Sequence, residues 1–207
     1  MHEPTWLRWA RVLQAIAQTG LTYAKDKYDI ERYEAVRGLA SQMMAAGSDA
    51  DAEKIAALFE REAGYATPKI DVRAAVFRGD EILLVKEETD GKWSLPGGWG
   101  DVNQSASDCI VREVEEESGF RVRATKLAAV YDRAKHPHTP PMPFYCYKMF
   151  FLCDLIGGEA RTSIETTDVD FFAADALPDL SVGRVLDYQI ARMFEHRRNP
   201  DLPTDFD

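Results

Sequence analysis

Three glutamates near the middle of the chain have the spacing to hold a metal ion. Glu113, Glu116 and Glu117 lie three and four positions apart, so on a helix they share one face about a turn apart. Carboxylates gathered on one face repel one another unless a cation lies between them. Hard oxygen ligands of this kind suit Mg²⁺ or Mn²⁺, which bind a few carboxylates together with water and substrate phosphates. The spacing therefore predicts a divalent-cation site on an acidic helix face.

Start and stop signals of a helix flank these glutamates. Ser105 is a candidate N-cap, with Asp108 three residues on as its partner in a capping-box-like arrangement. Gly119 stands at a position where helices end. The residues predicted to face inward are Ile110, Val111 and Val114. Before the helix, Pro96, Gly97 and Gly98 break the preceding segment, and glycine lets the backbone come close to a ligand.

These residues resemble the sequence box of the Nudix hydrolases, which is a glycine, five residues, a glutamate, seven residues, then Arg-Glu-apolar-x-Glu-Glu-x-Gly-apolar. The matching positions are Gly98, Arg112, Glu113, Val114, Glu116, Glu117, Gly119 and Phe120. Gln104 stands where the family pattern has glutamate. In that pattern the first glutamate mainly orients the arginine, so the resemblance implies that Gln104 still hydrogen-bonds Arg112, without the charge. It also implies that Arg112 orients the glutamates and does not touch the substrate.

The resemblance implies metal-assisted hydrolysis of a phosphoanhydride. Mg²⁺ or Mn²⁺ held by the three glutamates would neutralise diphosphate charge and activate the attacking water, and a nearby carboxylate would take its proton. For that carboxylate the family spacing favours Glu165 over Asp168, although a structural or merely exposed Glu165 stays open. A second hypothesis is a Nudix domain that binds a nucleotide-sugar ligand as a sensor, because Gln104 departs from the box. A pure interaction scaffold is a third.

Segments outside the box narrow the resemblance. They are residues 6–44, LPGGWGDVNQS at 95–105, DRAKHPH at 132–138 and FFAADALPDLS at 171–181. Together they are similar to the Nudix subgroup with a helical N-terminal domain that hydrolyses CDP-choline and ADP-ribose. The implied substrate is a nucleoside diphosphate linked to a small moiety, and the products are a nucleoside monophosphate and a phosphorylated partner. We predict Gly97 and Gly98 as substrate-binding residues.

The loop from Asp132 to Met142 concentrates positive charge in an acidic chain. Its basic side chains are Arg133, Lys135, His136 and His138. A cationic loop beside a metal cluster suits a diphosphate, so Arg133, Lys135 and His136 are predicted to bind substrate. Two alternatives remain: a transition-metal pair of His136 and His138, and surface charge with no specific role.

The first part of the chain has the period of amphipathic helices. Apolar residues recur at three and four, at Trp6, Trp9, Ala10, Leu13, Ile16 and Ala17, and again at Ile30, Tyr33, Val36, Ala40 and Met43. Gly20 is expected to interrupt the first run, and Ala46 to Asp49 to form a stop and a new N-cap before a third helix. We predict a helical domain over residues 1–66 and a catalytic domain over 67–207.

This helical domain has more large apolar groups than three short helices can bury. Those counted are Trp6, Trp9, Leu13, Ile16, Tyr23, Tyr28 and Tyr33. Each such side chain stabilises by roughly 1.5 to 3 kcal/mol when fully buried, so leaving several exposed is costly. A two-fold contact is the commonest way to cover such a patch. We predict a homodimer in which the N-terminal helices of one chain cover or border the catalytic domain of the other. Docking onto the chain's own sheet is the alternative.

From Ile70 the hydrophobic period changes to two. Predicted strands are 70–77, 82–86, 93–95, 122–131 and 144–155, with another ending at Phe172, and Ser181 is expected to cap a last helix carrying Val182 to Phe194. Strands on both sides of a helix, with a second helix at the end, predict an α/β/α sandwich around a mixed sheet. That architecture also matches the resemblance.

Composition restricts the partners and the compartment. The net charge of −10 and the lack of a basic run argue against nucleic acid, whose phosphates demand a positive surface. Three cysteines without metal-ligand spacing suggest a reduced, intracellular chain. Arg8 and Arg11 interrupt the first apolar run, and no apolar stretch is long enough for a bilayer. We therefore predict a cytoplasmic protein with no membrane partner.

Overall fold

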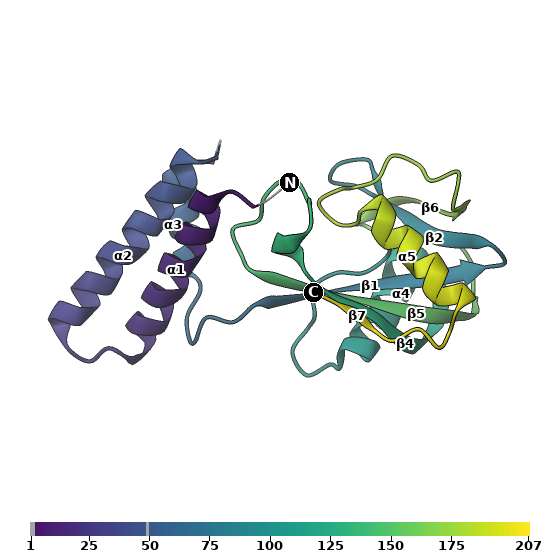
Figure 1. The fold of residues 1–207 in the computed structure, drawn as a ribbon, viewed down its shortest axis with the longest axis horizontal. Coiled ribbons are helices and arrows are strands. Elements are labelled where there is room, and N and C mark those ends of the chain that lie inside the picture. Colours follow the sequence, from purple (N-terminus) through teal and green to yellow (C-terminus); the bar gives the residue numbers. More distant parts are fainter. Residues whose placement is uncertain (1–2, 49) are drawn as a thin grey trace. The chain divides into compact units, whose positions relative to one another are not determined.

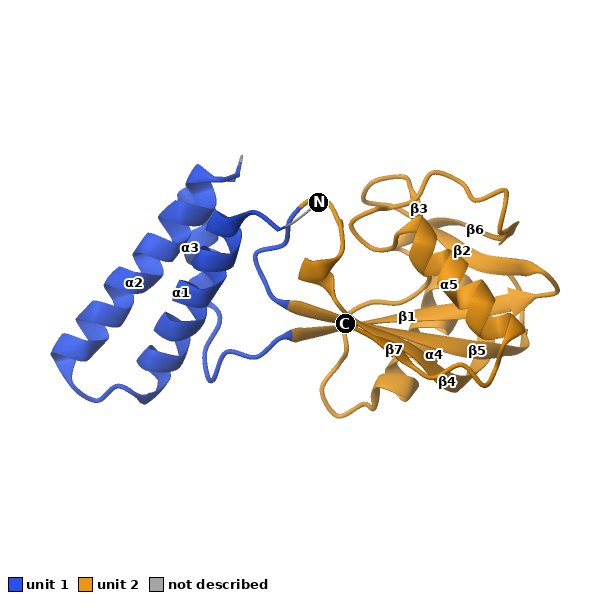
Figure 2. Ribbon diagram, in the orientation of Figure 1, with its two compact units in different colours: residues 1–68, 141–145 blue, residues 69–140, 146–207 orange. Residues whose placement is uncertain are grey.

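The computed structural model describes residues 3–48 and 50–207. The described residues divide into two compact units, within the bounds 1–68 plus 141–145 and 69–140 plus 146–207 (Figure 2). The segment 141–145 belongs to the first unit although it lies between two strands of the second. One contact that joins this segment to the first unit is a hydrogen bond from Arg11 Nε to the carbonyl of Met142 at 2.9 Å. The predicted boundary between residues 66 and 67 stays a prediction.

The first unit contains three helices, α1 (Thr5–Tyr23), α2 (Lys27–Ala46) and α3 (Ala52–Glu60) (Figure 1). Asp26 caps α2, because its carboxylate accepts from the backbone N–H of Tyr28 and Asp29. Asp51 caps α3 in the same way through Glu53 N–H. The expected N-cap at Asp49 lies outside the described residues.

Gly20 does not interrupt the first helix, so that expectation was wrong. α1 continues to Tyr23, and a Cβ at Gly20 would lie 2.3 Å from Cε1 of Tyr33 on α2. The glycine therefore allows the two helices to approach closely. A small core between the three helices consists of Leu7, Ala10, Ala40, Met44, Ile55 and Phe59.

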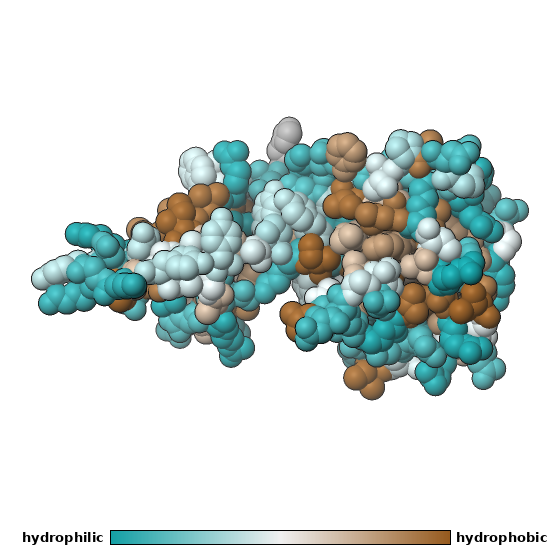
Figure 3. Space-filling view, turned by 90° about the horizontal axis from the view of Figure 1, so that it is seen from below, coloured by the Kyte–Doolittle hydropathy of each residue, from teal (hydrophilic) through white to brown (hydrophobic). Residues whose placement is uncertain are grey.

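Several predicted apolar residues of this unit stay at its surface. The exposed fractions are 54% for Trp9, 50% for Ile16 and 67% for Tyr23. Figure 3 shows hydrophobic residues among hydrophilic ones on one face of the molecule. The spacing of three and four residues therefore located the helices but did not fully identify their buried face. Leu7 and Gln14, which are buried on α1, were not among the residues predicted to be apolar positions of this helix.

The second unit is built on a mixed sheet. Its strands are β1 (Lys69–Arg78), β2 (Glu81–Glu87), β3 (Trp93–Ser94), β4 (Phe120–Asp132), β5 (Cys146–Gly158), β6 (Thr166–Ala173) and β7 (Asp205–Phe206). The order is β3-β2-β1-β5-β4-β7, and β6 also pairs with β2. β1 runs parallel to β5 and antiparallel to β2. The predicted hairpin is confirmed, and the strand ends differ from the predicted ones by a few residues.

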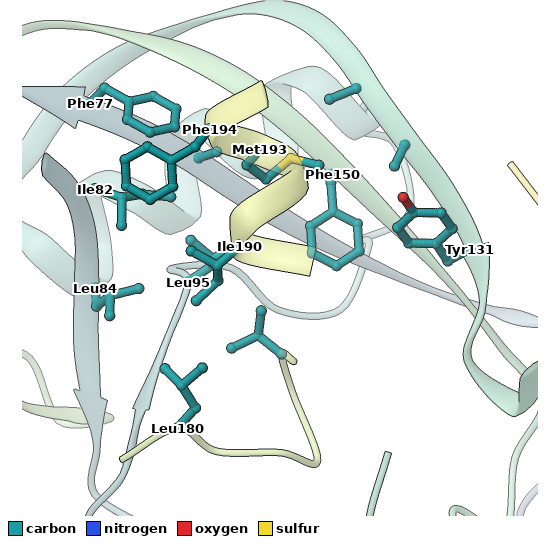
Figure 4. Packing of buried hydrophobic residues seen from close by; sticks show 14 residues of the cluster. Phe77, Ile82, Leu84, Leu95, Tyr131, Phe150, Leu180, Ile190, Met193 and Phe194 are labelled. Carbon is teal, nitrogen blue, oxygen red and sulfur yellow. The ribbon is translucent and has the colours of Figure 1, made fainter. Parts of the chain in front are cut away.

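Helices α4 (Ala106–Ser118) and α5 (Asp187–Arg198) pack on opposite faces of this sheet. Side chains alternate along β1, so Val72 and Ala74 pack against Ile110 of α4 while Ala75 and Phe77 face α5. In Figure 4, Ile190, Met193 and Phe194 of α5 point toward Phe77, Ile82 and Phe150. The rings of Phe77 and Phe194 meet edge to face at 5.1 Å. The predicted α/β/α architecture, preceded by helices, is confirmed.

The prediction that Ser181 caps the last helix was wrong. Ser181 Oγ donates to Asp90 Oδ2 at 2.7 Å, and its N–H donates to the carbonyl of Trp93 at 2.8 Å. These contacts tie residue 181 to the β2–β3 region, and a turn follows. α5 begins only at Asp187, after an extended Leu186, whose N–H donates to Gln189 Oε1 at 3.1 Å.

No helix within the described ranges is long and apolar enough to cross a membrane.

Candidate active site

Helix α4 begins and ends at the predicted residues. Ser105 Oγ accepts from Asp108 N–H at 3.1 Å and donates to its carboxylate at 2.6 Å, so the expected cap is present. Gly119 ends the helix with a φ of +76°. A Cβ there would lie 2.4 Å from the carbonyl oxygen of Glu159, so this position demands glycine both for its backbone and for space.

The loop of residues 95–100, which we call the glycine loop, is bound along strand β1. Val72 N–H donates to Gly98 O at 2.8 Å, and Ala74 N–H donates to Pro96 O at 2.9 Å. Gly97 has a φ of +136°, and a Cβ there would lie 2.0 Å from Val72 O. The loop can therefore lie this close to the strand only with glycine at that position.

Both predicted glycines contact the acidic helix. Gly97 N–H donates to Glu117 Oε2 at 2.8 Å. A Cβ at Gly98 would lie 3.1 Å from Glu113 Oε2, so the Gly98 backbone faces that carboxylate. The structure thus brings Gly97, Gly98, Glu113 and Glu117 together.

Arg112 connects the remaining residues of the box. Its Nε donates to Gln104 Oε1 at 3.2 Å, which is the hydrogen bond expected in place of the family's ion pair. The guanidinium also pairs with Glu113 at 2.7 Å, with Glu116 at 2.5 Å and with Asp101 at 2.7 Å. Sequence reasoning missed Asp101, whose only signal was an acidic residue three positions before Gln104.

The environment of the glutamates disfavours their charged forms. The pKa of Glu117 is raised to about 8, chiefly by burial; the carboxylates of Glu87 and Glu113 act in the same direction and the Arg73 cation opposes them. Burial also raises the pKa of Glu113, where Arg112 opposes the shift and Glu116 and Glu165 add to it. Several carboxylates that raise one another's pKa form a site with excess negative charge.

The donor set therefore fits a divalent cation in its chemistry, since all three side chains offer hard oxygen atoms. In this structure, however, the three carboxylates are not arranged around a common point where a metal ion could bind. Glu113 and Glu116 bind Arg112, and Glu117 accepts from Gly97. Across residues 3–48 and 50–207, no three His, Cys, Asp or Glu side chains converge closely enough to hold a metal as they stand. Holding an ion there would require Glu113 and Glu116 to turn away from Arg112.

Glu165 lies near this cluster, immediately before β6. Its carbonyl accepts from Glu88 N–H at 2.9 Å, its side chain is exposed, and its charge contributes to the raised pKa of Glu113. Asp168 lies further along β6 and pairs across the strands with Lys86 of β2. The choice of Glu165 over Asp168 as the proton acceptor stays a prediction.

The cationic loop is organised mostly by contacts with its own surroundings. Arg133 is buried and donates to the carbonyl oxygens of Pro140 at 2.9 Å and Gly183 at 3.3 Å. His136 contacts the Tyr188 hydroxyl and, through Nε2, Asp207 Oδ1 at 2.9 Å. Lys135 is exposed. Substrate binding by Arg133, Lys135 and His136 stays a prediction.

His138 does not pair with His136 as a ligand would. Its ring is buried, its Nδ1–H donates to the carbonyl of Val182 at 2.9 Å, and its Nε2 lies 3.3 Å from the amide nitrogen of Gln189. Burial, together with the Lys148 cation, lowers the pKa of His138 to about 3. The histidine is therefore neutral and satisfied by its neighbours.

A buried group of charges under the glycine loop was also missed. Asp71, Arg73 and Lys148 are 6%, 5% and 2% exposed, and Glu87 is 6% exposed. Asp71 accepts from both cations, and Glu87 accepts from Ser94 Oγ at 2.6 Å. The signal in the sequence was an acidic and a basic residue two positions apart in an otherwise apolar strand, which places both on one face.

Comparison with known proteins agrees with this geometry. Residues 67–193 match the model of the NUDIX domain, and residues 4–59 match that of the UDP-X-like, N-terminal oligomerisation domain. The chain therefore belongs to the Nudix family, and the identification made from the box is confirmed. It is a Nudix pyrophosphohydrolase with an N-terminal oligomerisation domain.

Similar proteins extend over most or all of the chain. A Bacillus subtilis (strain 168) protein, YjhB, provisionally named an ADP-ribose pyrophosphatase, is 46% identical over 202 residues, which is 98% of this chain and 97% of that one. The crystal structure of an ADP-ribose pyrophosphatase from Streptococcus suis is 42% identical, with a TM-score of 0.60, over 68% of this chain and 100% of the other. That of a UDP-X diphosphatase is 35% identical, with a TM-score of 0.63, over 100% of both chains.

Proposed function

We propose that the protein hydrolyses the diphosphate of a nucleoside diphosphate linked to a small moiety, with ADP-ribose as the first candidate and UDP-linked compounds as the second. The observation that carries the proposal is the acidic face of α4 with the glycine loop against it, where Gly97 N–H binds Glu117 and Gly98 faces Glu113. The names of the relatives support the two candidate substrates. CDP-choline, which the sequence resemblance implied, appears in none of the three names given above.

In this proposal the residues have separate roles. Glu113, Glu116 and Glu117 hold Mg²⁺ or Mn²⁺, which when bound neutralises diphosphate charge and acidifies the attacking water. Arg112 orients Glu113 and Glu116 from behind, as its ion pairs with both indicate. Glu165 accepts the proton of the water. Gly98 is half-buried, and the absence of a side chain there leaves room for the phosphates.

A phosphate-release assay tests this function. ADP-ribose, UDP-sugars, CDP-choline and nucleoside triphosphates are incubated with the enzyme, Mg²⁺ and a phosphatase that acts only on the phosphomonoester products, and chromatography identifies the nucleotide formed. We expect a nucleoside monophosphate from ADP-ribose or a UDP-linked compound, with no release when EDTA is present. Activity confined to nucleoside triphosphates contradicts the proposal.

We also propose that the oligomer is a homodimer formed through α1. Val12, Ile16 and Tyr23 are 52%, 50% and 67% exposed, and with Gly20, Tyr33 and Tyr65 they line one hollow of the helical unit. Leaving this apolar surface in water is unfavourable, and a two-fold contact covers it. That the helices of one chain border the catalytic unit of the other stays a prediction.

Charge substitutions in the full chain test the dimer. Ile16→Asp places a carboxylate in the proposed contact and is expected to give a monomer in light scattering, whereas Leu39→Asp, at a residue of α2 that is 57% exposed and does not line the hollow, leaves the dimer intact. A monomeric wild-type protein, or an Ile16→Asp protein that is still dimeric, contradicts the proposed interface.

A further inference from the structure

Strand β1 carries a buried ion pair next to the proposed active site. Arg73 Nε donates to Asp71 Oδ1 at 3.0 Å and its Nη2 donates to Oδ2 at 2.8 Å, which is a two-pronged pair. Both side chains are almost fully buried. Buried charges are costly unless they are paired, and a two-pronged pair also fixes the plane of the guanidinium.

The remaining nitrogen of Arg73 reaches the glycine loop. Nη1 donates to the carbonyl of Leu95 at 3.1 Å. Two residues later, Gly97 N–H donates to Glu117 Oε2 at 2.8 Å. The backbone bonds of β1 hold this loop at Pro96 and Gly98, so Arg73 adds a side-chain contact at the end where the loop leaves β3. The charge of Arg73 also acts on Glu117, whose pKa it lowers against the larger effect of burial.

We propose that Arg73 is a positioning residue of the hydrolase: its guanidinium, oriented by Asp71, fixes the Leu95–Gly97 backbone so that the Gly97 N–H stays on Glu117. The inference rests on the proposed function, in which Glu117 holds the metal. Glu117 would hold the ion with a carboxylate of which one oxygen, Oε2, accepts from the loop. Partners that orient a metal ligand in this way affect metal affinity as well as rate.

Lys148 offers a matched control within the same cluster. Its Nζ donates to Asp71 Oδ1 at 2.5 Å, and it is as buried as Arg73. Within the described ranges it forms no hydrogen bond to residues 95–100. Removing either cation leaves Asp71 paired with the other. If Arg73 serves stability alone, removing Arg73 and removing Lys148 should have equal effects on Mn²⁺ affinity. If Arg73 positions the loop, only its removal should lower that affinity.

The experiment compares Arg73→Lys, Arg73→Met and Lys148→Met in the full chain. Binding of Mn²⁺ alone is followed by the electron paramagnetic resonance of the free ion, and kcat and KM for ADP-ribose are measured with the thermal unfolding midpoint. We expect Mn²⁺ affinity to fall about 10-fold or more in both Arg73 variants, with kcat reduced more than KM is raised. We expect it to stay within about 3-fold in Lys148→Met, even where the unfolding midpoint falls equally.

Arg73→Lys keeps a buried cation beside Asp71 but loses the planar fork, so it provides a folded variant if Arg73→Met does not fold. In its amide spectrum we expect the Gly97 N–H to lose protection from solvent exchange. Wild-type Mn²⁺ affinity in Arg73→Lys, or an equal loss in Lys148→Met, overturns the positioning role while the hydrolase function stands. If the wild type neither binds Mn²⁺ nor cleaves ADP-ribose or a UDP-linked compound, both proposals fail.

Discussion

At the scale of single residues, the active-site helix combines carboxylates with one cation that holds them in place. Arg112 binds Glu113 and Glu116, so in the proposed function a metal ion would compete with the guanidinium for the same oxygen atoms. Gln104 replaces a charged partner of Arg112 by a neutral one, at 3.2 Å. The carboxylate of Asp101 pairs with the same guanidinium at 2.7 Å, so Arg112 still has a third charged partner beside Glu113 and Glu116.

The metal assignment predicts large losses of turnover from small changes. Glu116→Gln and Glu117→Gln keep the size of the side chain but remove the charge that holds the cation, so we expect kcat to fall by roughly 10²-fold or more in each. The unfolding midpoint should change little, because the amide oxygen introduced by Glu117→Gln can still accept from Gly97. Steady-state kinetics with ADP-ribose is the measurement, and Glu115→Gln, exposed on the same helix, is the control. Near-normal turnover in both variants contradicts the assignment.

Glu165 and Asp168 provide a test of the proton acceptor. Both side chains are exposed; the charge of Glu165 contributes to the raised pKa of Glu113, and Asp168 lies farther along the chain, within β6. We expect Glu165→Gln to lower kcat for ADP-ribose, measured by steady-state kinetics, by about 10²-fold, the usual size of a general-base contribution. Asp168→Asn should stay near the wild type. A collapse of the Asp168 variant alone would mean that the wrong carboxylate was chosen.

At the scale of elements, α4 is held between two glycine-dependent segments. The glycine loop needs Gly97 to pass Val72 O, and the helix end needs Gly119 to turn beside Glu159. In the last turn of α4, the carbonyl of Glu117 accepts a hydrogen bond from Thr166 Oγ1 of β6 at 2.7 Å. The catalytic helix is therefore fixed at its end by the same strand that carries Asp168 and that begins next to Glu165.

Two glycines with positive φ separate backbone strain from crowding. Gly79, with φ +60°, has open space around a Cβ, whereas a Cβ at Gly119, with φ +76°, meets a carbonyl oxygen at 2.4 Å. Gly79→Ala is expected to cost about 1 kcal/mol of unfolding free energy, from backbone strain alone. Gly119→Ala should cost about 3 kcal/mol or more, because overpacking adds to it. Urea unfolding measures both, and equal losses would show that the contact at Glu159 relaxes freely.

At the scale of the whole molecule, the buried charges beneath the glycine loop make the stability of the fold depend on pH. One carboxylate, Asp71, serves two buried cations. Burial favours its neutral form, but Arg73 and Lys148 together outweigh this and lower its pKa to about 2. Lys148 has only a share of that carboxylate, so burial prevails there and lowers its pKa to about 8, with Asp71 opposing.

The Asp71 pairing predicts a loss of stability in acid. Its folded pKa of about 2 lies below the ordinary value of 3.8, so the stabilisation is complete above pH 4 and disappears as the pH falls through 2. The loss amounts to about 2 kcal/mol. Asp205, whose pKa is lowered to about 2 by its hydrogen bond to Arg192, contributes over the same range.

The contribution of Asp71 is therefore measured as a difference. Urea unfolding of the wild type and of Asp71→Asn, from pH 5 to pH 2.5, should give a shallower dependence on pH for the variant, and Asp205→Asn serves as a comparison at a partly exposed site. Parallel curves for the wild type and Asp71→Asn would mean that the pair contributes nothing to acid sensitivity.

The sequence determined the features that depend on local spacing. The period of the apolar residues located the helices and most strands, and the box placed the acidic face, the Ser105 cap and the Gly119 end, because these depend on residues within a few positions of each other. The same local rules failed at Gly20 and Ser181. At Gly20 the helix continues, and the missing side chain makes room for the ring of Tyr33. At Ser181 the hydroxyl donates to distant Asp90 and does not cap a helix.

Only the tertiary structure decided which charged residues are buried and which distant partner each of them has. It showed that Arg73 and Lys148 share Asp71 beneath the glycine loop, that Arg133 is buried against backbone carbonyls, and that Asp101 completes the partners of Arg112. A charge in a sequence carries no sign of burial or of its partner across the sheet. Both are set by strand order, and strand order depends on contacts between residues that lie far apart in the chain.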